Sequence, residues 1–560
     1  MGSEGAYASL KIEMAEQADP AREPWRAALW TLGLAGVVAG VLLTRGGLPP
    51  YDDAFFFGRF ARNLFEHGTY AWNVQDGPVH GNTSQLFQVL VTAMYAAAGD
   101  YTAAATRLVL AGSLVGAAAA LGRWGAGSGG RWLAAALAFS SPVALATVVS
   151  GMETAVALLL GALFLGALTL GRAGIAAGLA VALFATRPDT ALLTLGTLGL
   201  WVPTGATDRS PGAPWLSRRG VGLAAAALGG MLGLLLLYRL SYGTAFPLSF
   251  YLKSGLTEVY DARFLALSRD AKLRHFACFL LSAAPLLALI ARAPGRSWRL
   301  AAPAALFLTY QLAFTVDVMG LHGRFFVPAL PWLAAAAAAG VRPHGRRLVF
   351  VLGWGLLGLA TAIAWRTGWL PQDTGWAIGR VSVWSYGAAW AAGLIALLPG
   401  PVAPSRRGLG VLIIAAAGVL LSAPAERWRG QEVPTDADYA QGLIAQTTSW
   451  RGLNQLTRCL GTDLRVYHSE IGVPGVLLPD GRITDLGGLM NPALALEGAD
   501  VDAACLADQP DAIFLPHRNY TALNAALTDG ACLRGYTRVV KKSSSPLYVR
   551  TDRLAQYRCE

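Results

Sequence analysis

Long apolar runs alternate with short polar segments over the first three quarters of the chain. Thirteen of these runs are apolar enough to be membrane helices, although several are shorter than the roughly 20 residues that a perpendicular span needs. They cover residues 27–44, 104–121, 131–149, 152–169, 173–186, 189–203, 219–240, 275–292, 300–316, 327–341, 348–366, 383–399 and 408–422. The pattern predicts a polytopic α-helical membrane protein with a transmembrane domain over residues 27–422.

The basic residues of the short loops set the expected topology. They form pairs, namely Arg123 and Arg131, Arg218 and Arg219, Arg296 and Arg299, Arg346 and Arg347, and Arg406 and Arg407. If a further apolar run, residues 86–98, also crossed the membrane, every pair would lie outside. The positive-inside rule therefore predicts that this run lies in the interface, that the tail 1–26 is cytoplasmic and that the C-terminus is extracytoplasmic.

This topology places the unusual polar residues on one side of the membrane. They lie in segments 45–103, 186–189, 241–274, 317–326 and 367–382 and around residue 150, whereas the loops expected inside carry little but Arg, Gly and Pro. Function is therefore expected on the outer face.

The last part of the chain, residues 423–560, has a different pattern. Short β-rich stretches at 464–468, 482–485, 512–515, 537–540 and 547–550 alternate with helical patterns such as 439–460. We expect a small C-terminal α/β extracytoplasmic domain.

Composition agrees with a membrane protein, since 54% of residues are hydrophobic and only 14% are charged. The formal net charge of +11 reflects loop topology rather than nucleic-acid binding, because no basic stretch is interleaved with aromatic residues. Four of the five cysteines, Cys459, Cys505, Cys532 and Cys559, lie in the C-terminal domain. If that domain is outside the cell, disulfides are expected, in one of three pairings.

The first outer segment carries the strongest candidate chemistry. Asp52 and Asp53 follow directly on the first span, where carboxylates are costly to place. In a helix, Asp52, Arg59 and Asn63 would share one face. The segment could be an amphipathic interfacial helix with a solvated ion pair. It could also hold a catalytic base, Asp52 or Asp53, for sugar transfer from a lipid phosphate, which needs one base and several cations.

Other outer segments supply candidate partners for these two carboxylates. Four cations could hold a donor phosphate, namely Arg59, Arg187, Lys253 and Arg324. Substrate contacts are predicted for Asn63, Asn82, Thr83, Glu153, Asp317 and His322. Glu153 could instead serve its helix dipole, and Glu470 and Asp485 could cap loops or contact the acceptor. No cofactor is firmly implied, although adjacent carboxylates could hold a divalent cation.

An ordered series of motifs resembles the GT-C superfamily of membrane glycosyltransferases. The first loop matches at 52–54, Arg59, 61–64, Gly68, Asn73 and 81–84, followed by 150–154, 187–189, 247–253, Asp317, 324–328, 470–472 and 484–489. Within the superfamily, the chain is similar to the bacterial branch of the mycobacterial terminal arabinofuranosyltransferase. The resemblance spans nearly the whole chain, and its first-loop part is the most specific.

The resemblance implies a GT-C fold and an inverting transfer from a polyprenyl-phosphate donor to a cell-envelope glycan or protein. It suggests a pentose such as arabinofuranose, a prokaryotic inner membrane location, and a base at Asp52 or Asp53, with Asp52 slightly favoured. The chain departs from the family pattern at His80, where an acid is expected, and at Gln85, where a proline is common. The first departure argues against a second carboxylate and a metal in this loop.

Two other classes of protein remain as alternatives. A transporter or flippase of a lipid-linked glycan usually carries repeated halves and polar groups near the membrane midplane. The chain shows no repeat, and its polar residues gather on one face. A non-catalytic scaffold that displays the C-terminal domain would not depend on Asp52 or Asp53.

Overall fold

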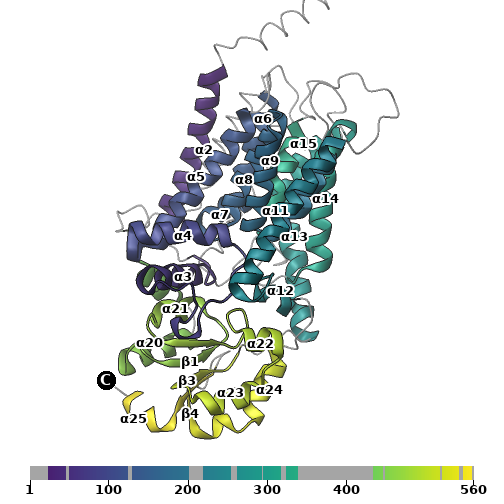
Figure 1. Cartoon of the computed structure of the whole chain (residues 1–560). Helices are drawn as coiled ribbons and strands as arrows, with labels where there is room; N and C mark the ends of the chain where they lie inside the picture. Colours follow the sequence, from purple (N-terminus) through teal and green to yellow (C-terminus); the bar gives the residue numbers. More distant parts are fainter. Residues whose placement is uncertain are drawn as a thin grey trace, which may run out of the picture.

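The computed structural model describes residues 23–45, 50–123, 129–200, 218–253, 262–292, 294–316, 323–338, 433–444, 448–516, 520–540 and 546–557. These residues form a helical bundle with a unit containing a β-sheet at one end of it (Figure 1). Three of the predicted spans, 348–366, 383–399 and 408–422, lie outside the described residues, so the number of spans in the whole chain stays a prediction.

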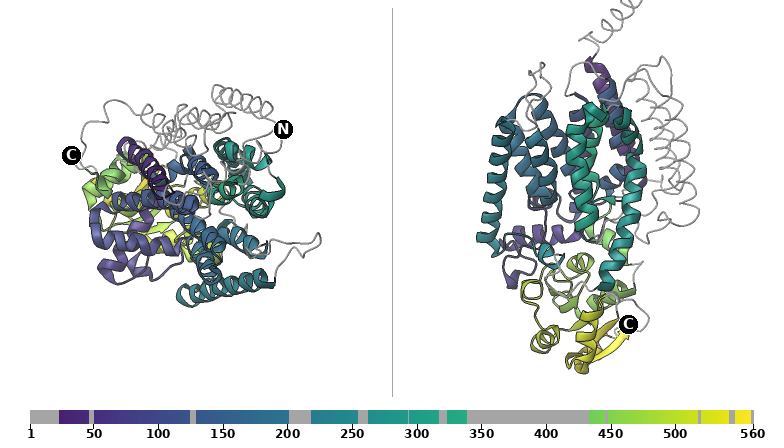
Figure 2. Two further views of the ribbon diagram at one scale, coloured as in Figure 1. Left: turned by 90° about the horizontal axis from the view of Figure 1, so that it is seen from above. Right: turned by 90° about the vertical axis from the view of Figure 1, so that its right-hand side faces the viewer.

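The bundle is built from the apolar runs that the sequence shows. Its helices are α2 (Glu23–Arg45), α5 (Thr102–Arg123), α6 (Gly129–Phe139), α7 (Pro142–Val149), α8 (Thr154–Thr169), α9 (Ala173–Thr186), α10 (Ala191–Leu200), α11 (Arg218–Tyr242), α13 (Ala262–Arg292), α14 (Pro294–Phe314) and α15 (Leu330–Ala338). Most of them run side by side, as two views at right angles show (Figure 2). Small residues permit close packing: a Cβ on Gly161 of α8 would lie 2.8 Å from the Trp332 ring of α15.

Fewer helices than predicted are long enough to cross a membrane by themselves. Within the described residues three are, namely 85–123 taken as one stretch, Gly220–Tyr242 and Ser268–Arg292. The expected span 131–149 is bent, because α6 and α7 meet at 57°. Ser140 and Ser141 at this break donate their hydroxyls to the carbonyls of Ala136 and Ala138, and Pro142 begins α7 because it cannot continue a helix.

Two helices of the first outer segment lie across the end of the bundle. These are α3 (Ala54–His67) and α4 (Gln85–Ala98), and Figure 1 shows them between the bundle and the sheet. Helix α3 buries Phe55, Phe56, Phe57 and Phe60 and exposes its other face. It ends at Gly68, whose φ of 68° suits glycine.

The C-terminal unit is a five-stranded mixed sheet with helices. The strands are β1 (Arg465–His468), β2 (Arg482–Asp485), β3 (Ala512–Phe514), β4 (Tyr536–Val540) and β5 (Leu547–Arg550), in the order β2-β1-β3-β5-β4. Strand β1 is parallel to β2 and β3, while β5 is antiparallel to β3 and β4. All five lie within one residue of the positions predicted from the sequence.

The remaining helices of this unit are short. They are α19 (Asp436–Ile444), α20 (Thr448–Leu460), α21 (Gly472–Leu477), α22 (Pro492–Glu497), α23 (Val501–Asp508), α24 (Thr521–Asp529) and α25 (Leu554–Tyr557). A disulfide joins Cys505 of α23 to Cys532, with the two Cα atoms 5.9 Å apart. Cys278 in the bundle is buried.

Candidate active site

The Tyr51–Asp53 turn is held in place by the loop that precedes α8. The Tyr51 amide donates to the Ser150 carbonyl at 3.0 Å. Gly151 has a φ of 74°, and a Cβ there would lie 2.6 Å from the Ala54 side chain. The motif around Ser150 and Gly151 therefore allows the aspartate turn to approach the bundle closely.

Asp52 is buried beneath the C-terminal unit. Its two carboxylate oxygens accept hydrogen bonds from the Gly472 and Val473 amides, at 3.2 and 2.6 Å. A Cβ on Gly472 would lie 1.9 Å from the Asp52 carbonyl oxygen, so this approach requires glycine. Burial, together with the charge of Asp53, raises the pKa of Asp52 to about 7 although the two amides act against the rise.

Asp53 points to a different partner, the guanidinium of Arg324. The Arg324 Nη2 atom lies 3.7 Å from the Asp53 carboxylate, whose side chain is 26% exposed. The guanidinium also lies over the Tyr51 and Phe325 rings. Its buried Nε and Nη1 atoms have no hydrogen-bond partner among the described residues. Arg324 therefore has donors available for an anionic ligand.

Arg187 lies next to Arg324 but is already neutralised. Its guanidinium pairs with Asp189 at 2.8 Å and with Glu153 at 3.6 Å, and it donates to the Arg324 carbonyl at 3.4 Å. Glu153 thus belongs to this ion-pair cluster. The cluster holds the backbone of Arg324 in position, and a phosphate would have to compete with two carboxylates for Arg187.

Arg59 differs from the prediction that it binds phosphate. All five of its N–H groups are used, because the side chain donates to the carbonyls of Trp72, Gly475, Leu478 and Gly481 and to the Asn73 amide oxygen. Burial lowers the pKa of Arg59 to about 9. The prediction is corrected for a physical reason: the guanidinium lies inside the junction of α3 with the C-terminal unit and has no N–H left for a ligand.

The other predicted contacts of the first segment also have structural partners. Asn63 donates to the Ala71 and Trp72 carbonyls, and Asn82 donates to the Tyr70 hydroxyl and to Gln88. Thr83 is exposed. Of the three residues expected on one helix face, Arg59 and Asn63 lie on the buried face of α3. Asp52 lies before the helix begins.

The remaining predicted residues are only partly described. Lys253 ends α12 (Leu248–Lys253), and the preceding Leu252 packs on Gly488 of the C-terminal unit. Asp317 and His322 lie outside the described residues. The roles of these three residues stay predictions.

Sequence reasoning did not place Glu470 beside Asp52. Burial and the charges of Asp52, Asp53 and Asp485 raise the pKa of Glu470 to about 8. Asp485, by contrast, caps its own loop, accepting from the Gly487 and Met490 amides. The signal for Glu470 in the sequence is its place in the 470–472 motif, which also contains Gly472.

Two histidines of the segments that carry the candidate residues, His80 and His468, are buried. Burial lowers the pKa of His80 to about 4 and that of His468 to about 3, so both rings are neutral. The Nδ1 atom of His468 accepts from the Glu470 amide, and His80 lies against Tyr238 and Tyr242. In the part of the chain that the structure describes, no three acidic, histidine or cysteine side chains gather as metal ligands.

Comparison with known proteins identifies the fold. No family model and no curated protein sequence matches the chain. Two crystal structures of ArnT from Cupriavidus metallidurans are similar to it, one bound to undecaprenyl phosphate (TM-score 0.54) and one in the apo state (TM-score 0.53). Each is 13% identical, and each similarity covers 94% of this chain and 98% of ArnT. The chain therefore shares the overall fold of these ArnT structures.

Proposed function

We propose that the protein is an inverting glycosyltransferase that moves a sugar from polyprenyl phosphate to an acceptor hydroxyl. The observation that carries the proposal is Arg324, whose buried Nε and Nη1 atoms have no partner among the described residues and whose Nη2 atom lies beside Asp53, the neighbour of Asp52. The undecaprenyl phosphate bound to ArnT supports a lipid donor of this class. A pentose such as arabinofuranose is the sugar, as the resemblance to the narrower branch suggests, and an envelope glycan or protein is the acceptor.

In the proposed reaction the acceptor oxygen attacks the anomeric carbon as the bond from that carbon to the phosphate oxygen breaks. The acceptor proton goes to Asp52, whose raised pKa makes it a stronger base than an ordinary carboxylate. The leaving phosphate keeps the electron pair of the broken bond and is stabilised by Arg324. Attack opposite the phosphate inverts the anomeric centre. Asp53 orients Arg324.

Access to Asp52 is part of the proposal, because only 3% of this residue is exposed. The loop that contains Glu470 and Gly472 covers its carboxylate. An acceptor hydroxyl reaches Asp52 when this loop moves aside. Each oxygen of Asp52 accepts one backbone N–H, which leaves lone pairs for the incoming proton.

The proposal includes a location and a topology. The protein spans the inner membrane of a prokaryote with the C-terminal unit outside, where a disulfide such as Cys505–Cys532 is stable. The candidate residues then face the outer surface. Asp52 and Asp53 directly precede α3, which lies at the end of the bundle that carries the sheet (Figure 1), whereas a transporter would need its polar groups near the midplane.

The first test measures lipid binding. Purified protein is titrated with undecaprenyl phosphate, and binding is followed by the shift of the thermal unfolding midpoint. Arg324→Ala should weaken binding by about 10²- to 10³-fold because the phosphate loses its charge-assisted donors. Arg62→Ala is the matched control, since Arg62 pairs on the surface with Glu66. Unchanged binding by Arg324→Ala would contradict the proposed phosphate site.

A further inference from the structure

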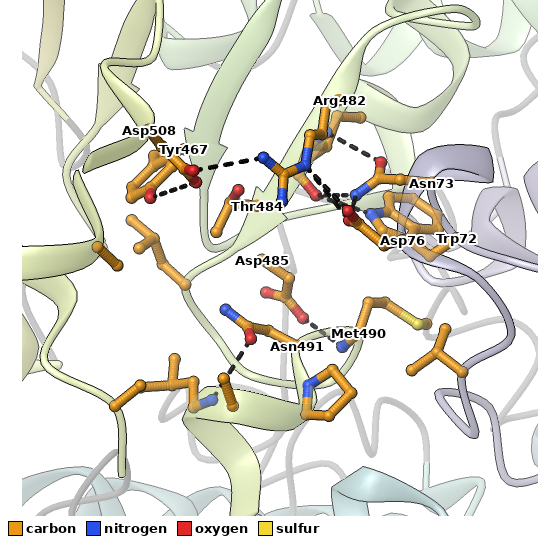
Figure 3. Close-up of a pocket in the computed structure, with 18 of the residues that line it drawn as sticks. Trp72, Asn73, Asp76, Tyr467, Arg482, Thr484, Asp485, Met490, Asn491 and Asp508 are labelled. Carbon is orange, nitrogen blue, oxygen red and sulfur yellow. Dashed lines mark hydrogen bonds and ion pairs between the residues drawn. The ribbon is translucent and has the colours of Figure 1, made fainter. Parts of the chain in front are cut away.

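A cavity of about 470 Å³ lies between the first outer segment and the C-terminal unit. Trp72, Asn73 and Asp76 form one wall, and residues of β1, β2 and the chain around α22 form the others (Figure 3). This volume is in the range of ligand pockets in proteins. The cavity is separate from the Asp53–Arg324 pair, which does not line it.

The charges that line the cavity disfavour an anion. Four carboxyl groups face one guanidinium, and the charged lining residues are Asp76, Asp485, Glu497, Asp508 and Arg482. Arg482 is held between Asp76 and Asp508, at 3.0 and 3.4 Å. The cavity is therefore unsuited to the donor phosphate.

The cavity also presents free hydrogen-bonding groups opposite an apolar surface. Thr484 and Asn491 point into the open space near Asp485 (Figure 3). Neither the Thr484 hydroxyl nor the Asn491 amide nitrogen has a hydrogen-bond partner within the described ranges. Leu494 and Val501 line the same space. Polar edges opposite an apolar wall match a sugar ring, which has hydroxyl edges and a C–H face.

The cavity is connected to the proposed base through two side chains. Asp485 lies in the wall of the cavity. Its charge, like that of Asp52, helps to raise the pKa of Glu470. Asp485 also pairs with His468 across β2 and β1. His468 lies four residues before Gly472, whose amide, at the start of α21, bonds Asp52. The wall of the cavity is therefore continuous in the chain with the segment that covers Asp52.

We propose that this cavity binds an uncharged saccharide unit of the acceptor glycan, next to the unit that receives the new sugar. The inference rests on the proposed function and adds the class of acceptor, a neutral glycan. An anionic acceptor would be repelled by the four carboxyl groups that line the cavity.

The test uses the full-length protein in nanodiscs and short neutral oligosaccharides of a pentose and of a hexose series. Binding is measured by saturation-transfer NMR for the wild type and for Thr484→Val with Asn491→Asp. Both changes remove donors, while Asn491→Asp keeps a side-chain oxygen to cap α22. We expect one series to bind and the double variant to bind it about tenfold more weakly. Asn454→Asp, a surface change beside Gln441, should have no effect.

Several outcomes would overturn the inference. Neither series binding, or equal binding by the double variant, would do so. In a transfer assay the double variant should raise KM for the acceptor and leave KM for the lipid donor unchanged, and the reverse would assign the cavity to the donor. If Thr484→Val with Asn491→Asp unfolds, Thr484→Val alone is measured, with an expected loss of about threefold. Loss of acceptor binding together with an inactive Asp52→Asn supports both proposals. A fully active Asp52→Asn would remove only the assigned base, and absence of transfer by the wild type would remove the proposed function, while neither result would remove oligosaccharide binding in the cavity.

Discussion

Two arginines at the same end of the bundle, Arg59 and Arg324, have opposite surroundings. Every N–H group of Arg59 is bonded to the protein, mainly to backbone carbonyls of the C-terminal unit. Arg324 leaves two buried nitrogen atoms, Nε and Nη1, without a partner among the described residues, and its Nη2 atom lies 3.7 Å from the Asp53 carboxylate. Free hydrogen-bonding capacity, more than charge or burial, therefore distinguishes a candidate binding residue from a structural one.

The largest expected effect is on stability and comes from Arg59. Arg59→Met leaves the carbonyls of Gly475, Leu478 and Gly481 without their donor, so the free energy of unfolding should fall by about 3–5 kcal/mol. Chemical denaturation in detergent measures it. Arg62→Met, one turn away on the same helix, should cost less than about 1 kcal/mol because its ion pairs are exposed. Equal losses of unfolding free energy for Arg59→Met and Arg62→Met would contradict the structural role of Arg59.

Arg324 should show the reverse of this behaviour. Arg324→Ala is expected to change the free energy of unfolding by less than about 1 kcal/mol, since its contacts are one long ion pair and two ring faces. The loss should appear in lipid phosphate binding instead. A large loss of stability would make Arg324 a second structural arginine.

The buried carboxyls predict a smaller effect of pH on stability. The folded-state pKa values of Asp52, Asp436 and Asp485 are raised to about 7 and that of Glu470 to about 8, mainly by burial. Unfolded carboxyls lose their protons near pH 4, so the folded state holds more protons up to pH 8. Stability should therefore fall as pH rises through this range.

The neutral histidines oppose this trend at acid pH. His80 and His468 have lowered pKa values in the folded state. Their contribution to the free energy of unfolding therefore rises with pH up to about 6.5, the pKa of histidine in the unfolded chain. The fall should be clearest between about pH 6.5 and 8, in thermal unfolding midpoints. Glu470→Gln, which cannot ionise, should reduce the fall of the unfolding midpoint between these pH values. An unchanged fall would contradict the burial of the Glu470 carboxyl.

The sequence predicted the elements better than the contacts between them. The strands were located correctly because alternating apolar positions and turn residues are local signals. The break between α6 and α7 was missed, since a single proline in an apolar run is compatible with one kinked span. Local pattern thus predicts which residues form an element.

The candidate site shows what local pattern leaves out. Arg59 was predicted to bind the donor phosphate because the expected reaction needs cations, but its partners include carbonyls more than 400 residues away. Glu470 approaches Asp52 for the same long-range reason. Asp53 and Arg324 were correctly expected on one side of the bundle, where they pair.

The central claim is that Asp52 takes the proton from the acceptor. The most direct measurement is the rate of sugar transfer from a polyprenyl-phosphate donor by Asp52→Asn. We expect the transfer rate to fall by about 10²- to 10⁴-fold. Undecaprenyl phosphate should still bind, and the unfolding midpoint should stay near that of the wild type. Asp53→Asn should act mainly on KM for the donor, through Arg324. Transfer by Asp52→Asn at the wild-type rate would contradict the account.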